Sequence, residues 1–115
     1  MKLWVDDVRP APDGYIWCKS ANETKNVISA TEEYEEGALD SLDYYWLEEH
    51  DGPITLIDID HDAGDYVSQG GDYIKLLDWL EETGRNYPIH IHSMNVVGKQ
   101  NMLAICKRNG WKVIP

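Results

Sequence analysis

The sequence predicts an α/β fold, a three-layer sandwich in which helices cover both faces of a mostly parallel, five-stranded sheet. Short apolar runs rich in β-branched residues alternate with longer stretches whose apolar residues recur at helical spacing. This alternation is typical of α/β domains. With 115 residues the chain is long enough for one core and too short for two. We therefore expect a single domain over residues 1–115.

The predicted strands are residues 2–5, 15–19, 54–59, 88–93 and 111–114. Residues 54–59 form a continuous apolar run, as expected of a central strand that is covered on both faces. Residues 7–14 contain two prolines and a glycine, which prevent a helix, so this segment is predicted to be a loop.

Four helices are predicted between these strands. Ser20 and Glu23 have the spacing of a capping box, which predicts a helix that runs to about Glu33. A second amphipathic helix is expected at residues 36–49. A third begins near residue 73 and ends at Gly84, and the last covers residues 98–109 and ends at Gly110, because glycine is the preferred residue after a helix.

The charge of the chain restricts its partners. Ten Lys and Arg residues oppose 21 Asp and Glu residues, for a formal charge of −11. This charge repels a phosphate backbone, so we expect no binding of bulk duplex nucleic acid, although an RNA end in a metal-loaded pocket is compatible with it. The sequence does not indicate an oligomeric state.

The compartment follows from two further observations. We find no apolar stretch of the length that a signal peptide or a membrane span requires, and we expect no membrane association. Cys18 and Cys106 lie far apart without CxxC spacing, which favours reduced thiols, with a disulfide as the alternative. We expect a cytoplasmic protein.

Polar residues follow three of the predicted strands abruptly. Asp6-Asp7 follows the first strand, Asp60-His61-Asp62 follows the third, and His92-Ser93-Met94-Asn95 follows the fourth. Ligands of open α/β sheets bind outside the carboxyl ends of the strands. We therefore expect a ligand site at these ends, and the residue types favour phosphate.

Asp6, Asp7 and Asp60 are the candidate metal ligands. A hard cation such as Mg²⁺ prefers carboxylate oxygens and keeps several waters that a phosphate can replace. The alternative interpretation is that these residues only end a strand and cap loops, since Asp is common in turns.

His61 and His92 are the candidate acid and base, because imidazole can gain or lose a proton near neutral pH. Asp60 and Asp62 flank His61 and can fix its tautomer. The alternative is that both histidines are structural, and this is the interpretation we prefer for His90, which is expected inside the sheet.

Arg9, Ser93 and Asn95 are the candidate phosphate-binding residues. Arg9 can clamp two phosphate oxygens from a proline-stiffened loop, or it can pair with a nearby acid. Ser93 and Asn95 lie near the start of the last predicted helix, where an anion is favoured, but the same residue types are ordinary helix caps.

The sequence resembles the cyclic-phosphate-processing receiver family, a group of small bacterial and phage proteins related to response-regulator receiver domains. The resemblance rests on three ordered motifs: residues 3–14 (LWVDDVRPAPDG), residues 60–64 (DHDAG), and residues 92–98 (HSMNVVG) with Asn101-Met102. It implies a receiver-like (flavodoxin-like) fold and the processing of cyclic phosphate on RNA ends or nucleotides.

By this resemblance, Asp6 and Asp7 match the metal-binding acids of receivers, Asp60 matches the phosphoacceptor and Ser93 matches the hydroxyl residue after the fourth strand. Residues 7–14 are too few for the first receiver helix, which leaves antiparallel pairing of the second strand open. The lysine that receivers carry at the tip of the last strand is missing, because Lys112 comes too early.

These observations together predict a Mg²⁺-assisted, phosphoesterase-like domain, a cyclic-phosphate hydrolase in which His61, His92 and Asp60 are catalytic. Three alternatives stay open. The first is a non-enzymatic signalling receiver that accepts phosphate at Asp60. The second is a haloacid-dehalogenase-type phosphatase that uses Asp58-Ile59-Asp60. The third is an acidic phage or bacterial module that binds a basic protein surface, which the charge of −11 suggests.

Overall fold

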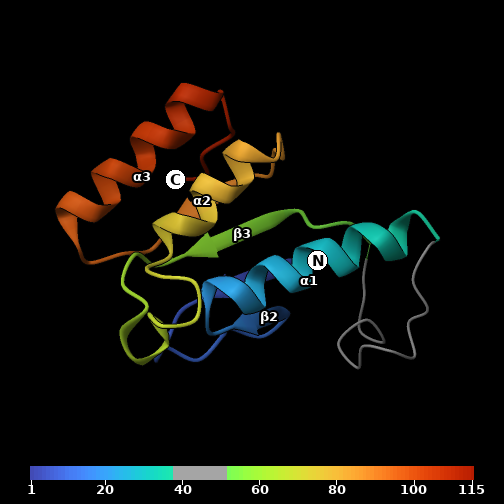
Figure 1. Cartoon of the computed structure of the whole chain (residues 1–115), viewed down its shortest axis with the longest axis horizontal. Helices are drawn as coiled ribbons and strands as arrows, with labels where there is room; N and C mark the ends of the chain where they lie inside the picture. The colour runs from blue at the N-terminus through green and yellow to red at the C-terminus, as the bar shows by residue number, and fades with distance from the viewer. Residues whose placement is uncertain (38–51) are drawn as a thin grey trace.

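The computed structural model describes residues 1–37 and 52–115, and its centre is a parallel sheet in the order β2-β1-β3-β4 (Figure 1). The strands are β1 (Lys2–Val5), β2 (Tyr15–Cys18), β3 (Leu56–Ile59) and β4 (Ile89–Ile91). Every neighbouring pair in this sheet is parallel. All four carboxyl ends therefore lie along the same edge of the sheet.

The sheet has four strands rather than the five predicted. Residues 111–114 contribute only an isolated parallel bridge between Val113 and Ile89. Two backbone hydrogen bonds hold it: the Ile89 amide donates to the Lys112 carbonyl, and the Ile114 amide donates to the Ile89 carbonyl. The Trp111 amide still donates to the Cys106 carbonyl at the end of the preceding helix, which Gly110 caps, so little of the segment is left to pair.

The second strand is parallel to the first, and the antiparallel pairing that the sequence left open is not formed. The connecting residues 6–14 contain no helix, as predicted. A four-residue strand rises only about 13 Å. The connection must therefore return over a short distance, which an extended loop can cover without a helix.

The helices in the described residues begin and end close to their predicted positions. They are α1 (Ala21–Glu35), α2 (Ile74–Glu82) and α3 (Val96–Asn109), with a short 3₁₀ helix, η3 (Gly64–Tyr66), before α2. The Glu23 amide donates to Ser20 Oγ, which confirms the predicted cap of α1. The predicted helix at residues 36–49 lies almost wholly outside the described residues.

All three helices cover the same face of the sheet (Figure 1). The connections from β2 to β3 and from β3 to β4 step in the same direction along the sheet, and right-handed crossovers place both helices on one side. Seven strand residues that point to this side are fully or almost fully buried in one core with α1, α2 and α3: Leu3, Val5, Cys18, Ile57, Ile59, Ile89 and Ile91. Ile16 is partly buried and packs against this core.

The opposite face carries no helix from the described residues. Of the two helical layers in the predicted three-layer sandwich, the described residues therefore form one. The physical reason is the loop at residues 6–14, which replaces the helix that would have crossed this face. Neighbouring strands instead place Trp17, Trp4, Asp58 and His90 side by side across it. We call these four residues the cross-strand row.

Tyr73 connects α2 to the end of β2. Its side chain is fully buried, and its hydroxyl donates a 2.7 Å hydrogen bond to the Lys19 carbonyl. We predict that Tyr73→Phe lowers the free energy of unfolding by about 1–3 kcal/mol, because the Lys19 carbonyl loses its buried partner. Tyr15→Phe is the matched control, since no hydrogen bond of the Tyr15 hydroxyl is found in the described residues. Urea unfolding checks the prediction, and equal losses in both variants would contradict it.

Candidate functional site

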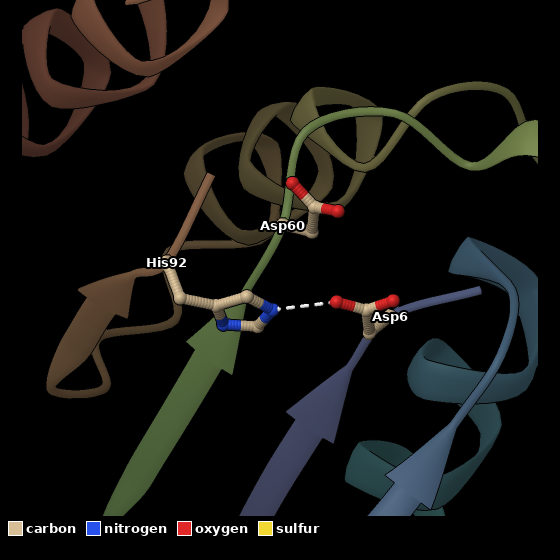
Figure 2. Close-up of side chains that lie close together, drawn as sticks. All are labelled: Asp6, Asp60 and His92. Atoms are coloured by element: carbon tan, nitrogen blue, oxygen red, sulfur yellow. Dashed lines mark hydrogen bonds and ion pairs between the residues drawn. The ribbon is translucent and has the colours of Figure 1, made fainter. Parts of the chain in front are cut away.

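Three chemically reactive side chains converge at the carboxyl ends of neighbouring strands. Asp6 follows β1, Asp60 follows β3 and His92 follows β4, and Figure 2 shows the His92 ring pointing at the Asp6 carboxylate, with Asp60 near both. One ligand atom from each lies within 4.8 Å of the other two. We call these three residues the Asp-His cluster. Its position confirms the expectation that polar strand ends gather at one edge of the sheet.

Asp6 is fully buried, yet its carboxylate has several donors. The amides of Val8 and Arg9 donate to Oδ1 at 3.0 and 2.9 Å, and Nε2 of His92 lies 2.9 Å from Oδ2. Burial opposes the negative charge, but the hydrogen bonds from Arg9, His92 and Val8 outweigh it and lower the pKa of Asp6. The loop at residues 6–14 therefore folds around an ionised carboxylate.

His92 lies between two carboxylates. Its Nδ1 is 2.6 Å from Oδ1 of Asp58, and its Nε2 is 2.9 Å from Oδ2 of Asp6. Burial disfavours the imidazolium, but the hydrogen bonds to Asp58 and Asp6 and their charges raise the pKa of His92 above its ordinary value. Both ring nitrogens can donate only in the charged form. In this arrangement His92 is therefore the positive partner of two acids.

The ring of His92 is also stacked on Trp4. The ring centroids are 3.9 Å apart and the planes differ by 2°. Trp4 is held in turn, because its Nε1 donates to the Arg9 carbonyl at 2.8 Å. The neighbouring Trp17 ties the same loop to the sheet, since its Nε1 donates to the Asp6 carbonyl at 2.8 Å. The helix-free face thus fixes both His92 and the loop that surrounds Asp6.

Asp58 is a site residue that we named from the sequence only in the dehalogenase-type alternative and not as a partner of His92. It is 6% exposed and contacts His92, and its Oδ1 also lies 4.0 Å from Nε2 of His90. His90 binds the Ile114 carbonyl through Nδ1 and has a structural position within β4, as expected. A usable signal was present: residues 58 and 60 are acids and residues 90 and 92 are histidines, and residues two apart on a strand share a face.

Asp7 lies beside the Asp-His cluster but is not one of its members. Its carboxylate is packed against Gly64, where a Cβ would stand 2.1 Å from Oδ2. Gly64 also has a φ of +53°, a conformation that suits glycine. Burial, followed by the charges of Asp6 and Asp60, raises the pKa of Asp7. The predicted role of Asp7 as a metal ligand stays a prediction.

His61 belongs to a second group of side chains. Its Nδ1 is 2.8 Å from Oδ1 of Asp62, and these two residues with Asp72 place ligand atoms within 4.8 Å of one another. The ring is packed against Gly98 of α3, where a Cβ would lie 2.5 Å from two ring carbons. His61 and His92 have no hydrogen-bond partner in common in the described residues. Their joint action as acid and base stays a prediction.

The predicted phosphate-binding residues surround these groups. The Nη1 of Arg9, an exposed residue, donates to the His92 carbonyl at 3.3 Å. Ser93 Oγ accepts from the Asn95 amide at 3.0 Å, and Asn95 Oδ1 accepts from the Gly98 amide at 2.8 Å. Asn95 is therefore the cap of α3, which was the alternative interpretation. Its side-chain nitrogen, Nδ2, also lies 3.4 Å from Oδ1 of Asp62.

The donor set of the Asp-His cluster fits a divalent cation. Two carboxylates and an imidazole are ordinary ligands of such ions, and they meet here on three separate strand ends. The repulsion that raises the pKa of Asp7 comes in part from Asp6 and Asp60. A cation among these acids would relieve that repulsion. The charges of the same acids also act on Tyr73, whose pKa is raised by burial first and then by Asp7, Asp6 and Asp60.

We predict that His92 gives the metal-free protein a pH-dependent stability. Folding raises the pKa of His92. Its contribution to the free energy of unfolding is therefore complete below the unfolded-state pKa of about 6.5, and it is lost as the pH rises through the folded-state pKa. Urea unfolding of the wild type and His92→Gln in a chelator should show a larger difference at about pH 5 than at about pH 9. A difference that does not change with pH would contradict the charged bridge.

We predict that Gly98→Ala destabilises the protein by about 1–3 kcal/mol, because the new methyl group overlaps the His61 ring. The His61→Ala background is the control. There the overlap is absent, and the same substitution should be neutral or stabilising, since alanine is the better helix former by about 1 kcal/mol. Unfolding free energies of the four proteins check this, and additive effects would show that the ring does not lie against α3.

A comparison with curated proteins found no match, and a comparison with solved structures found none either. A comparison with family models did find one: residues 1–108 match the family described as the cyclic-phosphate processing receiver domain. The match spans nearly the whole chain, including β1, the Asp-His cluster and almost all of α3, and it agrees with the parallel α/β sheet. The chain belongs to the cyclic-phosphate processing receiver domain family.

Proposed function

We propose that this domain hydrolyses cyclic phosphates, on nucleotides or on RNA ends, with the help of a divalent cation at the Asp-His cluster. The observation that supports this most directly is the meeting of Asp6, Asp60 and His92 at the carboxyl ends of parallel strands. This edge is where α/β sheets bind ligands. The family is also described by cyclic-phosphate processing.

The proposed reaction opens a cyclic phosphodiester. The oxygen of a water molecule forms a bond to phosphorus, and the bond from phosphorus to one ribose oxygen breaks. The water loses a proton to a base, and the released ribose oxygen takes up a proton from an acid. A bound cation would supply positive charge that stabilises the phosphate oxygens. The protein must then provide one proton acceptor and one proton donor.

His92 is suited to be the donor and His61 the acceptor. The hydrogen bonds of His92 to Asp58 and Asp6 favour its protonated form, which can give a proton to a leaving oxygen. His61 is bonded to Asp62 through Nδ1. The carboxylate can therefore hold the tautomer in which Nε2 accepts a proton, as in other acid–base sites.

The substrate is proposed to be small or to present a free end. Three residues lie in the loops beside the Asp-His cluster and the second group, and they supply a guanidinium, a hydroxyl and an amide for phosphate oxygens: Arg9, Ser93 and Asn95. The net charge of −11 opposes a long phosphate backbone. We therefore propose a cyclic nucleotide or a terminal cyclic phosphate rather than duplex nucleic acid.

The test is a panel of cyclic nucleotides and of oligonucleotides with cyclic-phosphate ends, incubated with the protein and Mg²⁺ or Mn²⁺. Ring opening is expected, and His61→Ala and His92→Ala should each lower the rate by about two to four orders of magnitude. Lys112→Ala should leave the rate unchanged, because Lys112 is exposed on the last segment. Absence of turnover across the panel would contradict the proposal. Stable phosphorylation of Asp60 by acetyl phosphate would instead favour the signalling receiver.

A further inference from the structure

We infer that Nε2 of His92 is itself a metal ligand, fixed by Asp58 and Trp4, and that the Asp-His cluster selects a transition-metal dication over Mg²⁺. This inference rests on the proposed function in one respect, the presence of a divalent cation at the cluster. It goes beyond that function by naming the class of metal, and it replaces the proton-donor role proposed for His92, because a nitrogen bound to the ion carries no proton to donate. It also gives two residues outside the cluster a positioning role.

The spacing between His92 and Asp6 is that of two ligands of one ion. Nε2 of His92 and Oδ2 of Asp6 are 2.9 Å apart. Two adjacent ligands at about 2.1 Å from a six-coordinate ion are separated by about 3 Å. Asp60 adds a third oxygen within 4.8 Å of the other two atoms. An ion can therefore join these atoms with only small movements of the side chains.

The His92 ring is held on two sides in the orientation that presents Nε2. Asp58 binds the opposite nitrogen, Nδ1, at 2.6 Å, and it is itself buried in β3. Trp4 covers one face of the ring in a parallel stack. Metal-binding histidines characteristically donate the N–H of their second ring nitrogen to a carboxylate, which fixes the tautomer and the ring direction. Asp58 is the carboxylate that can accept this hydrogen bond from His92.

The identity of the ligands decides the preferred metal. Mg²⁺ prefers oxygen ligands and binds through carboxylates, waters and phosphates. Imidazole suits transition metals, and its presence favours ions such as Zn²⁺, Fe²⁺ or Ni²⁺, with Mn²⁺ the weakest binder of the divalent series. The sequence predicted the three-carboxylate set Asp6, Asp7 and Asp60, for which Mg²⁺ is the natural ion. With His92 in place of Asp7 in that set, the expected ion changes from Mg²⁺ to a transition-metal dication.

The direct test is electron spin-echo spectroscopy of the protein loaded with Mn²⁺, because a directly bound imidazole nitrogen modulates the Mn²⁺ signal. We expect ¹⁴N modulation in the wild type and in His61→Phe, and its loss in His92→Phe. Phenylalanine keeps a ring on Trp4 while it removes both nitrogens. Circular dichroism confirms that each variant is folded. Modulation that survives in His92→Phe, or that disappears in His61→Phe, would overturn the inference.

Asp58→Asn is the milder variant, which keeps the shape of the side chain and tests the positioning role if His92→Phe does not fold. Titration calorimetry should show Mn²⁺ affinity lowered by about 10–100-fold, with a much smaller effect on the weaker Mg²⁺ binding. Asp62→Asn is the matched control, because Asp62 is bonded in the same way to His61 in the second group. It should leave Mn²⁺ affinity unchanged.

The results separate this inference from the proposed function. Tighter binding of Mg²⁺ than of Mn²⁺ by the wild type, or loss of Mn²⁺ binding in Asp62→Asn but not in Asp58→Asn, would overturn it. Cyclic-phosphate turnover with Mg²⁺ would still leave the proposed function standing. Conversely, nitrogen ligation without any turnover would support the metal site and contradict the phosphoesterase.

Discussion

The buried charge of Asp6 is the constraint on which the arrangement of this protein depends. A fully buried carboxylate is costly unless it is hydrogen-bonded and its charge is balanced. Here the amides of Val8 and Arg9 bind one oxygen and His92 approaches the other. These donors come from the loop after β1 and from the end of β4. The need to stabilise one carboxylate thus joins the loop to a strand two positions away in the sheet.

The loop that replaces a helix after β1 has a second consequence for the site. Because residues 6–14 form no helix, the described residues leave the face of the cross-strand row without a helical layer. That face has room for large rings, and Trp4 stacks on His92 there while Trp17 binds the Asp6 carbonyl. A helix packed on Trp4 would compete with the imidazole for the same indole. The short loop therefore leaves the Trp4 indole accessible for its stack with His92.

Much of the fold could be predicted because it depends on local signals. Ser20 caps α1 and Gly110 ends α3 in a left-handed conformation, as the residue types indicate. The gathering of polar strand ends followed from the parallel topology. The direction of β2 could not be predicted, since it depends on the distance that a helix-free loop can cover. The weak pairing of Val113 depends on competition with the cap of α3.

The site was harder to predict because the sequence does not say which polar side chains become partners. Asp7 is next to Asp6 in the chain, but opposite directions of neighbouring side chains send it toward Gly64. Asp58 is inside an apolar strand, and the apolar pattern gives no reason for a carboxylate there. The carboxylate is explained by its short contact with His92, which lies 34 residues away in the chain, and by the nearby ring of His90. Long-range charge pairing decided the membership of the cluster, and it leaves no periodic signal in the sequence.

The identity of the positive group beside the acids bears on the choice between phosphate storage and phosphate hydrolysis. Ordinary receivers, which this chain resembles, use a lysine at the tip of the last strand. Here Lys112 is exposed, and its carbonyl takes part in the single bridge to Ile89. The cation that contacts Asp6 is the imidazolium of His92. A lysine near its ordinary pKa holds its proton at neutral pH, whereas an imidazole can release it. A histidine at this place can give up its proton to a metal ion or to a leaving oxygen, which a lysine near its ordinary pKa cannot, and this difference supports the proposed bond cleavage over stable storage of a phosphoryl group.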